Sequence, residues 1–263
     1  MKLNLTRNKI IMKDINIKLV CKIFIVFLLL GPSLKVYAQV DIINEVMKQA
    51  NKLNETLLEM TALTDEEENN IGKEIYAEVL KSKTVISDYK YNVNAIFNKL
   101  LKQTARKKIK YQYTVIRENE VNAYALAGGK MLIHSKLIDF VDTEDELAFV
   151  IAHEIAHNEL KHCIKKIQYA VRANDINPTL GQVVNKAYQI YDMPFSKDEE
   201  FAADELGVKI LKKAGYKKEG AIRFFEKLAV LEKKYGQDDR DALNDFVSSH
   251  PTAEKRKLRV QKM

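Results

Sequence analysis

The chain has 263 residues, of which 46% are hydrophobic and 30% are charged, and its formal net charge is +7. This length suits one sizeable domain or at most two small ones, and the composition excludes an intrinsically disordered chain. A positive charge of this size would fit a nucleic-acid or anionic-membrane partner, so its position along the chain decides what it means.

Basic residues gather in the first 22 residues, directly ahead of the apolar run IFIVFLLLG at 23–31. This run is too short for a membrane-spanning helix, which needs roughly 20 apolar residues. A basic leader, a short apolar core and a small residue are typical of a secretory signal peptide, so we predict cleavage after Ala38, with an uncleaved anchor as the alternative. We therefore expect a signal peptide at 1–38, a mature domain at 39–263, and export to the periplasm or cell envelope, or secretion.

Removal of residues 1–38 would take away seven basic residues and one acidic residue, which leaves 36 bases and 35 acids. The positive balance therefore belongs to targeting, and we expect no nucleic-acid partner, while peripheral membrane association and oligomeric state stay open. The run RKKIK at 106–110 is predicted to be a solvated charged face. Because Cys21 lies in the leader, Cys163 would be alone, so the fold must be held by its core without an intramolecular disulfide.

The mature chain begins with three stretches whose apolar residues recur at helical spacing, at 41–60, 64–81 and 91–107. Aromatic and β-branched residues at 111–116 then predict a strand. The stretch 121–138 is typical of a strand, a Gly-Gly turn and a second strand. Together these strand segments predict a small β-sheet.

The helix with the clearest apolar stripe is expected as one continuous element at 143–171. Further helices are expected at 196–216, at 218–236 and within 248–260. Three capping boxes, each a Thr or Ser with a Glu three residues later, are predicted: Thr64 with Glu67, Thr143 with Glu146, and Ser196 with Glu199. Since no repeat or low-complexity linker divides these elements, we predict one mostly helical α+β domain.

The segment AHEIAHNEL at 152–160 carries an HExxH motif inside the expected long helix. Residues four apart on a helix are rotated by only about 40°, so His153 and His157 share a face at a spacing that suits two nitrogen ligands of one zinc ion. Glu154 lies about 100° further round, close enough to act as general base on a water bound to that metal. The alternative is an ordinary helix that happens to carry two histidines.

A catalytic zinc site also needs a third protein ligand. A third histidine after a glycine turn is excluded, because Leu160 and Cys163 occupy those positions and Leu160 is expected to keep the chain helical. On one continuous helix His162 would point about 180° away from His153, so we predict a packing or hydrogen-bonding role for it. Cys163 is predicted to be a small buried residue.

A glutamate from a later helix is the other solution. Glu200 and Asp204 in the segment EEFAADELG are four apart and share a helix face. Glu200 could therefore bind the metal while Asp204 accepts the second ring N–H of a ligand histidine. Taken alone, the two carboxylates would be ordinary surface acids.

Four separated segments, NAYALAGG, DELAFVIAHEIAHNELKH, EEFAADELGVKILKKAGY and SSHPTAEKR, occur in the order seen in gluzincin metallopeptidases. The chain resembles the group that includes the CAAX prenyl protease, the mitochondrial OMA-type protease and the bacterial periplasmic BepA-type proteases, and is most similar in kind to the small soluble bacterial members. The resemblance runs from about Thr64 to Arg256. It implies a single zincin-like domain with a small sheet at the cleft edge, and one Zn²⁺ per chain bound by His153, His157 and Glu200.

The same resemblance implies roles for further residues. Glu154 would be the general base, and Asp204 would be a partner of His153. His250 would lie over the metal, as an oxyanion donor or as a resting-state ligand, and Arg256 follows six residues later. A strand along the cleft would pair with the substrate backbone; its residues are Asn122, Ala123, Tyr124 and Ala125.

Two departures from the family pattern touch the cleft edge and bear on substrate preference. Ala127 stands where the family usually has proline, and HSKLI replaces a Thr-Gly-Leu stretch. The connector 165–195 is either a lid over the cleft or a pair of structural helices with a loop.

The function expected from these features is that of a zinc-dependent endopeptidase. It would cleave unfolded or misassembled exported or envelope proteins in protein quality control. One alternative is a latent zinc-binding, chaperone-like module with little peptidase activity, in which His250 is a fourth ligand. Another is a structural envelope protein with an accidental motif, which four motifs in register disfavour.

Overall fold

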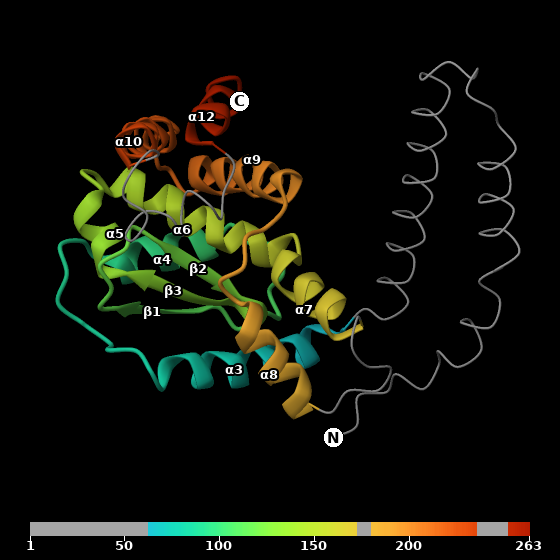
Figure 1. Cartoon of the computed structure of the whole chain (residues 1–263). Helices are drawn as coiled ribbons and strands as arrows, with labels where there is room; N and C mark the ends of the chain where they lie inside the picture. The colour runs from blue at the N-terminus through green and yellow to red at the C-terminus, as the bar shows by residue number, and fades with distance from the viewer. Residues whose placement is uncertain (1–62, 173–179, 236–251) are drawn as a thin grey trace, which may run out of the picture. The chain divides into compact units, whose positions relative to one another are not determined.

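The computed structural model describes residues 63–172, 180–235 and 252–263, which belong to a single unit of the chain (Figure 1). The expected signal peptide, the helix expected at 41–60 and His250 lie outside the described residues. The α-helices are α3 (Asp65–Leu80), α4 (Val93–Leu101), α5 (Ser135–Phe140), α6 (Glu144–Glu159), α7 (His162–Arg172), α8 (Leu180–Ile190), α9 (Lys197–Lys213), α10 (Glu219–Tyr235) and α12 (Ala253–Gln261). The strands are β1 (Gln112–Ile116), β2 (Ala123–Leu126) and β3 (Lys130–His134). The predicted mostly helical α+β domain with a small sheet is confirmed.

The sheet has the strand order β1-β3-β2, with β3 parallel to β1 and antiparallel to β2. A short 3₁₀ turn, η3 (Ala127–Gly129), joins β2 to β3, and Gly128 and Gly129 both have positive φ, at 69° and 73°. Glycine adopts this conformation without steric cost. Within the sheet as described, β2 is an edge strand, so one row of its backbone groups faces away from β3.

Helix α6 lies between the sheet and the helices α9 and α10 (Figure 1). Every residue of α6 from Glu146 to Asn158 is buried, which is why its apolar pattern is not confined to one face. Gly207 of α9 makes a close approach possible, because a Cβ at that position would lie only 3.2 Å from the backbone N and Cα of His153. This contact brings the first turns of α9 over the HExxH segment.

Two of the predicted capping boxes are complete, at Thr64 with Glu67 and at Ser196 with Glu199. At α6 the box is only half formed. The Thr143 hydroxyl accepts a hydrogen bond from the Glu146 N–H, but the Glu146 carboxylate accepts from the backbone of Asp142 instead of Thr143.

The prediction of one continuous helix at 143–171 is wrong. Helix α6 ends at Glu159, Lys161 has a φ of 63°, and α7 begins at His162. Contacts from the distant segment 102–110 end the helix. Arg106 donates to the carbonyl of Asn158 at 2.7 Å, which satisfies one of the C-terminal carbonyls. The Glu159 carboxylate accepts the backbone N–H of Arg106 and of its preceding residue.

The same contacts correct two further expectations. The helix expected at 91–107 ends at Leu101, because the chain turns there to reach the end of α6. Arg106 is not a solvated residue of RKKIK, since its guanidinium forms ion pairs with Asp65 and with the buried Glu68 at 2.7 and 2.6 Å.

The second strand expected in 121–138 is shorter than predicted. It ends at His134, where α5 follows.

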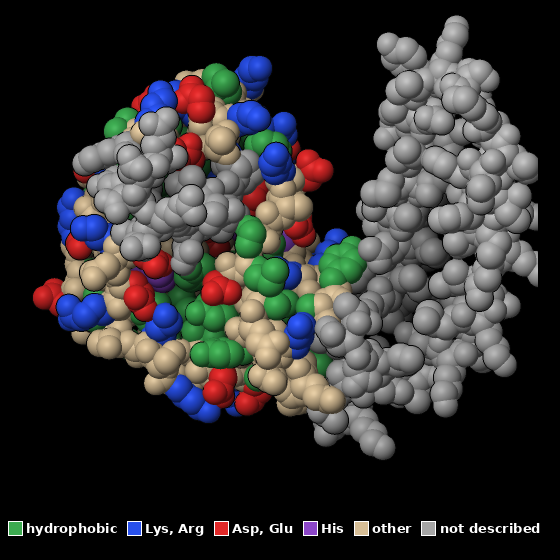
Figure 2. Space-filling view, in the orientation of Figure 1, with side chains coloured by type: hydrophobic (Ala, Val, Ile, Leu, Met, Phe, Trp, Pro, Cys, Tyr) green, Lys and Arg blue, Asp and Glu red, His purple; other side chains and the backbone are tan. Residues whose placement is uncertain are grey.

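The surface charges and the apolar character of the helices are the features that concern a nucleic-acid or membrane partner. Basic and acidic side chains are interspersed over the face seen in Figure 2. Among the described residues, none of the helices is both long enough and apolar enough to span a membrane.

Candidate metal centre

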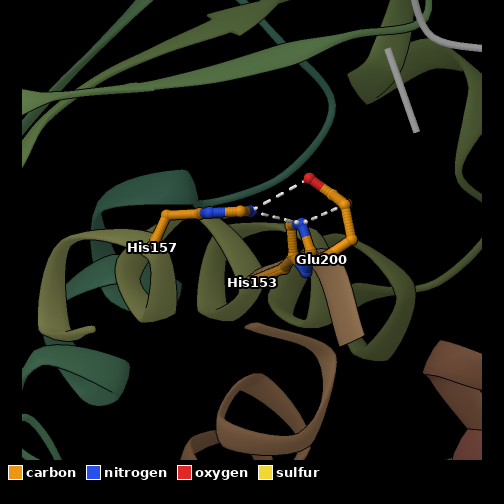
Figure 3. Close-up of side chains that lie close together, drawn as sticks. All are labelled: His153, His157 and Glu200. Carbon is orange, nitrogen blue, oxygen red and sulfur yellow. Dashed lines mark hydrogen bonds and ion pairs between the residues drawn. The ribbon is translucent and has the colours of Figure 1, made fainter. Parts of the chain in front are cut away.

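Three side chains from two helices converge at the centre of the domain (Figure 3). His153 and His157 project from one face of α6, and their Nε2 atoms are 3.0 Å apart. Glu200, in the first turn of α9, places one carboxylate oxygen 3.4 Å from the Nε2 of His153 and the other 3.4 Å from the Nε2 of His157. The side chains of His157 and Glu200 are fully buried, and that of His153 is 5% exposed.

These residues fit a zinc ion. Two ligand atoms at about 2.0–2.1 Å from a tetrahedral zinc are about 3.3–3.4 Å apart, close to the separations of 3.0, 3.4 and 3.4 Å among the three side chains. Two imidazole nitrogens and a carboxylate are also a ligand set that zinc uses in catalytic sites. The buried carboxylate of Glu200 already has one cationic partner, Arg256 at 3.1 Å, and a metal bound between it and the two imidazoles would compensate its charge further.

The Nδ1 of His153 lies 3.0 Å from the Oδ1 of Asp204, on the side of the ring opposite Glu200. Arg256 of α12 binds both oxygens of Asp204, at 2.8 and 2.6 Å, and its Nη1 is 3.1 Å from Glu200. Burial disfavours the charge of His153, but the carboxylates of Asp204 and Glu200 outweigh burial and raise its pKa to about 9 in the metal-free chain. Despite burial, Arg256 and His153 together hold the pKa of Asp204 below its ordinary value.

His157 has a different set of neighbours. Its Nδ1 is 3.0 Å from the Nδ1 of His162, the first residue of α7. Phe195 stacks on its ring, with the centroids 4.0 Å apart and the ring planes 19° from parallel. Burial lowers the pKa of His157 to about 3, so the imidazole is neutral at neutral pH and can offer a lone pair.

The hydrogen-bonding role predicted for His162 is confirmed by its contact with His157, but the prediction that it points away from the motif is wrong. Because the helix breaks at Lys161, His162 folds back toward His157. Phe195 was not singled out from the sequence at all. It lies just before α9. Neither its spacing from the motif nor the sequence around it distinguishes it from other aromatic residues.

Glu154 interacts both with the metal centre, through the charges of His153 and Glu200, and with the backbone of β2 at Ala125. It is buried, and burial together with the nearby Glu200 carboxylate raises its pKa to about 7, against the opposing influence of His153 and of a hydrogen bond from the backbone of Ala125 in β2. A carboxyl group whose pKa is near the working pH is suited to accept and to return a proton.

The strand predicted to line the cleft is β2, the edge strand. The carbonyl of Asn122 accepts the N–H of His134, so the alternating antiparallel pattern turns the backbone groups of Ala123 and Ala125 away from β3. The Ala123 N–H donates to the Asn122 side chain at 2.8 Å, and the Ala125 carbonyl accepts from Cys163 at 3.5 Å.

Two of the side chains predicted to line the cleft are Asn122, directly before β2, and Tyr124, within it. The buried Nδ2 of Asn122 has no hydrogen-bond partner within the described parts of the chain. Tyr124 is partly buried and packs edge-on against Tyr191 from the connector, at a centroid distance of 5.7 Å. The structure therefore brings the edge strand next to Glu154. His250, predicted to lie over the metal, is outside the described residues.

An HExxH helix whose two histidines meet a glutamate from a later helix is the arrangement of gluzincin metallopeptidases. The sequence model of Peptidase family M48 matches residues 89–263, and the chain belongs to that family.

Curated relatives share this part of the chain. The protein is 31% identical over 154 residues to "Mitochondrial metalloendopeptidase OMA1" of Arabidopsis thaliana, covering 56% of this chain and 30% of the relative. It is 25% identical over 154 residues to "Beta-barrel assembly-enhancing protease" of Escherichia coli K12, covering 52% and 32%. It is 31% identical over 132 residues to "Metalloprotease LoiP" of the same organism, covering 46% and 52%. The matches thus span about a third to a half of these relatives' lengths.

Proposed function

We propose that the chain is a zinc-dependent endopeptidase with one zinc ion per chain. The observation that carries this proposal is the convergence of the Nε2 atoms of His153 and His157 with the Glu200 carboxylate, directly beside Glu154. Membership of a peptidase family and the names of the relatives support the same reaction class.

The zinc, when bound, would supply Lewis-acid activation of water and of the scissile carbonyl. Glu154 would take the proton from the attacking water and return it to the leaving amine, for which its raised pKa suits it. Asp204 would accept the Nδ1–H of His153 and keep the Nε2 lone pair directed toward the metal. His250 would donate to the developing oxyanion, or would bind at the resting site.

Substrate binding is proposed at the outer edge of β2. An extended peptide could pair with the backbone of Ala123, while the Asn122 Nδ2 donates to a substrate carbonyl. Recognition through backbone hydrogen bonds favours unfolded segments, because a folded protein has its own backbone groups already paired. We therefore propose unfolded or misassembled proteins as substrates, in an exported setting such as the periplasm or cell envelope.

A latent zinc-binding module is the second candidate. The observation in its favour is that the outward-facing groups of β2 are already engaged, since the Ala123 N–H is bonded by Asn122 and the Ala125 backbone by Glu154 and Cys163. A substrate would have to displace these side chains before it could pair with the strand.

The test is zinc content together with cleavage of casein, measured on the purified chain, on Glu154→Gln and on Glu205→Gln. Glu205 is an exposed acid of α9 and serves as the matched control. About one zinc per chain with cleavage lost only in Glu154→Gln is the expected result. Zinc without cleavage in the parent chain would favour the latent module, and absence of zinc would exclude both.

A further inference from the structure

We infer that His162 fixes the tautomer and the orientation of the ligand His157 by accepting a hydrogen bond from its Nδ1–H, with Phe195 holding the ring face. The inference rests on the proposed metal centre, since it concerns how one ligand is presented to the zinc. His162 is thus a positioning residue for a reaction that it does not itself touch.

The geometry decides which nitrogen carries each proton. The Nδ1 atoms of His157 and His162 are 3.0 Å apart, so one of them must donate and the other accept. The Nε2 of His157 faces His153 and Glu200, and as a metal ligand it must keep its lone pair. A neutral His157 therefore carries its hydrogen on Nδ1 and donates it to His162, whose own hydrogen must be on Nε2.

Burial makes this contact specific. His157 is fully buried and His162 is 7% exposed, so water has little access to replace either partner. If the hydrogen bond were lost, a buried N–H of His157 would be left without an acceptor, and the ring would be free to rotate or to adopt the other tautomer. Both changes would remove the lone pair from the metal side.

Phe195 restricts the rotation of the His157 ring by covering one of its faces. It lies nearly parallel to His157 at 4.0 Å, while the hydrogen bond to His162 is made at the ring edge. The Nζ of Lys166 lies 4.4 Å from the centre of the Phe195 ring and donates to the carbonyl of Met193 at 2.6 Å. Lys166 thereby ties the turn before α9 to α7.

One face of α7 supplies both of these contacts. His162 and Lys166 are four residues apart and so lie one turn from each other on that helix. The helix break at Lys161 is what turns this face toward His157. The start of α7 and the turn before α9 therefore hold the second histidine, as Asp204 and Arg256 hold the first.

The test measures zinc affinity by chelator competition on the full chain and on three variants. His162→Leu removes the acceptor, and His162→Gln keeps an acceptor oxygen. His134→Leu is the control, because His134 is also a buried histidine (3% exposed) but belongs to β3 and bonds the carbonyl of Glu120. The proton positions are measured independently, by ¹⁵N NMR of the histidine rings in the zinc-loaded parent chain.

The expected result is about 10–100-fold weaker zinc binding in His162→Leu, with most of the affinity recovered in His162→Gln and retained in His134→Leu. The spectra should show a proton on the Nδ1 of His157 and none on the Nδ1 of His162. Unchanged affinity in His162→Leu, or a protonated Nδ1 on His162, would overturn the inference while leaving the zinc site standing.

If His162→Leu does not fold, the NMR assignment decides. A parent chain that binds no zinc would refute the proposed function and this inference together.

Discussion

The guanidinium of Arg256 holds the carboxylate of Asp204 at two points, with Nε 2.8 Å from Oδ2 and Nη2 2.6 Å from Oδ1. Both side chains are buried, and the same guanidinium lies 3.1 Å from Glu200. Because Arg256 belongs to α12 and Asp204 to α9, the last described helix of the chain is joined to the metal centre by a buried ion pair.

Arg256→Met should therefore be strongly destabilising. It removes the cation that compensates two buried carboxylates, and breaking a buried pair in this way costs about 3–5 kcal/mol. The measurement is urea unfolding of the metal-free chain, with Lys255→Met on the exposed face of α12 as the control. The control should change the free energy of unfolding by less than about 0.5 kcal/mol. Equal stability of the two variants would show that the ion pair contributes nothing.

Glu200→Gln should abolish tight zinc binding. The amide is neutral and a much poorer ligand than the carboxylate, so the loss should exceed the roughly 10–100-fold that follows from losing a hydrogen-bonding partner of a ligand. Chelator competition measures the loss, and Glu205→Gln, five residues further along α9 and exposed, should retain the parent affinity. An affinity within about tenfold of the parent chain would rule out Glu200 as a ligand.

The faces of the ligand helices were predictable because they depend on local geometry. Four-residue spacing places His153 with His157, and Glu200 with Asp204, whatever the rest of the chain does. The structure brings these residues together because α9 packs closely on α6 at Gly207. That packing could be inferred only from the resemblance, since nothing in helical periodicity says which face of one helix meets another.

The positions of His162 and Phe195 could not be predicted in the same way. No glycine or proline marks the end of α6, and the helix stops because Arg106 and Glu159 make contacts between segments more than 50 residues apart. Helix propensity alone favours continuation through Leu160, so tertiary contacts override it here. Phe195 reaches His157 only because of the path that the chain takes before α9.

Glu154 should make the stability of the metal-free chain depend on pH. Its pKa is about 7 in the folded chain and near 4.5 when unfolded, so the folded state keeps the proton to higher pH. The stabilisation is fully present below pH 4.5 and is lost as the pH rises to about 7, which amounts to roughly 3 kcal/mol. Glu154→Gln cannot ionise, so the difference between its unfolding free energy and that of the parent chain should change across this window. Parallel pH profiles would contradict the raised pKa.

Gly72 and Gly181 should respond to alanine in opposite directions. A Cβ on Gly72 of α3 would lie 2.0 Å from the carbonyl oxygen of Ala127, and no side-chain rotation can relieve a clash with backbone. Gly72→Ala should therefore lower the free energy of unfolding by about 1–3 kcal/mol and shift the η3 turn that follows the edge strand. Cleavage should fall with it, because β2 is the proposed substrate strand.

Gly181 lies in the first turn of α8, and beyond its own stretch of that helix no atom of the described residues lies within 4 Å of the same position. Its replacement by alanine should raise the free energy of unfolding by about 0.4–1 kcal/mol, because the unfolded chain loses conformational freedom. Chemical denaturation of both variants, with casein cleavage measured on the same samples, checks the pair. If Gly72→Ala were as stable as Gly181→Ala, the tight packing of α3 against the η3 turn would be wrong, and with it the rigid support of the edge strand.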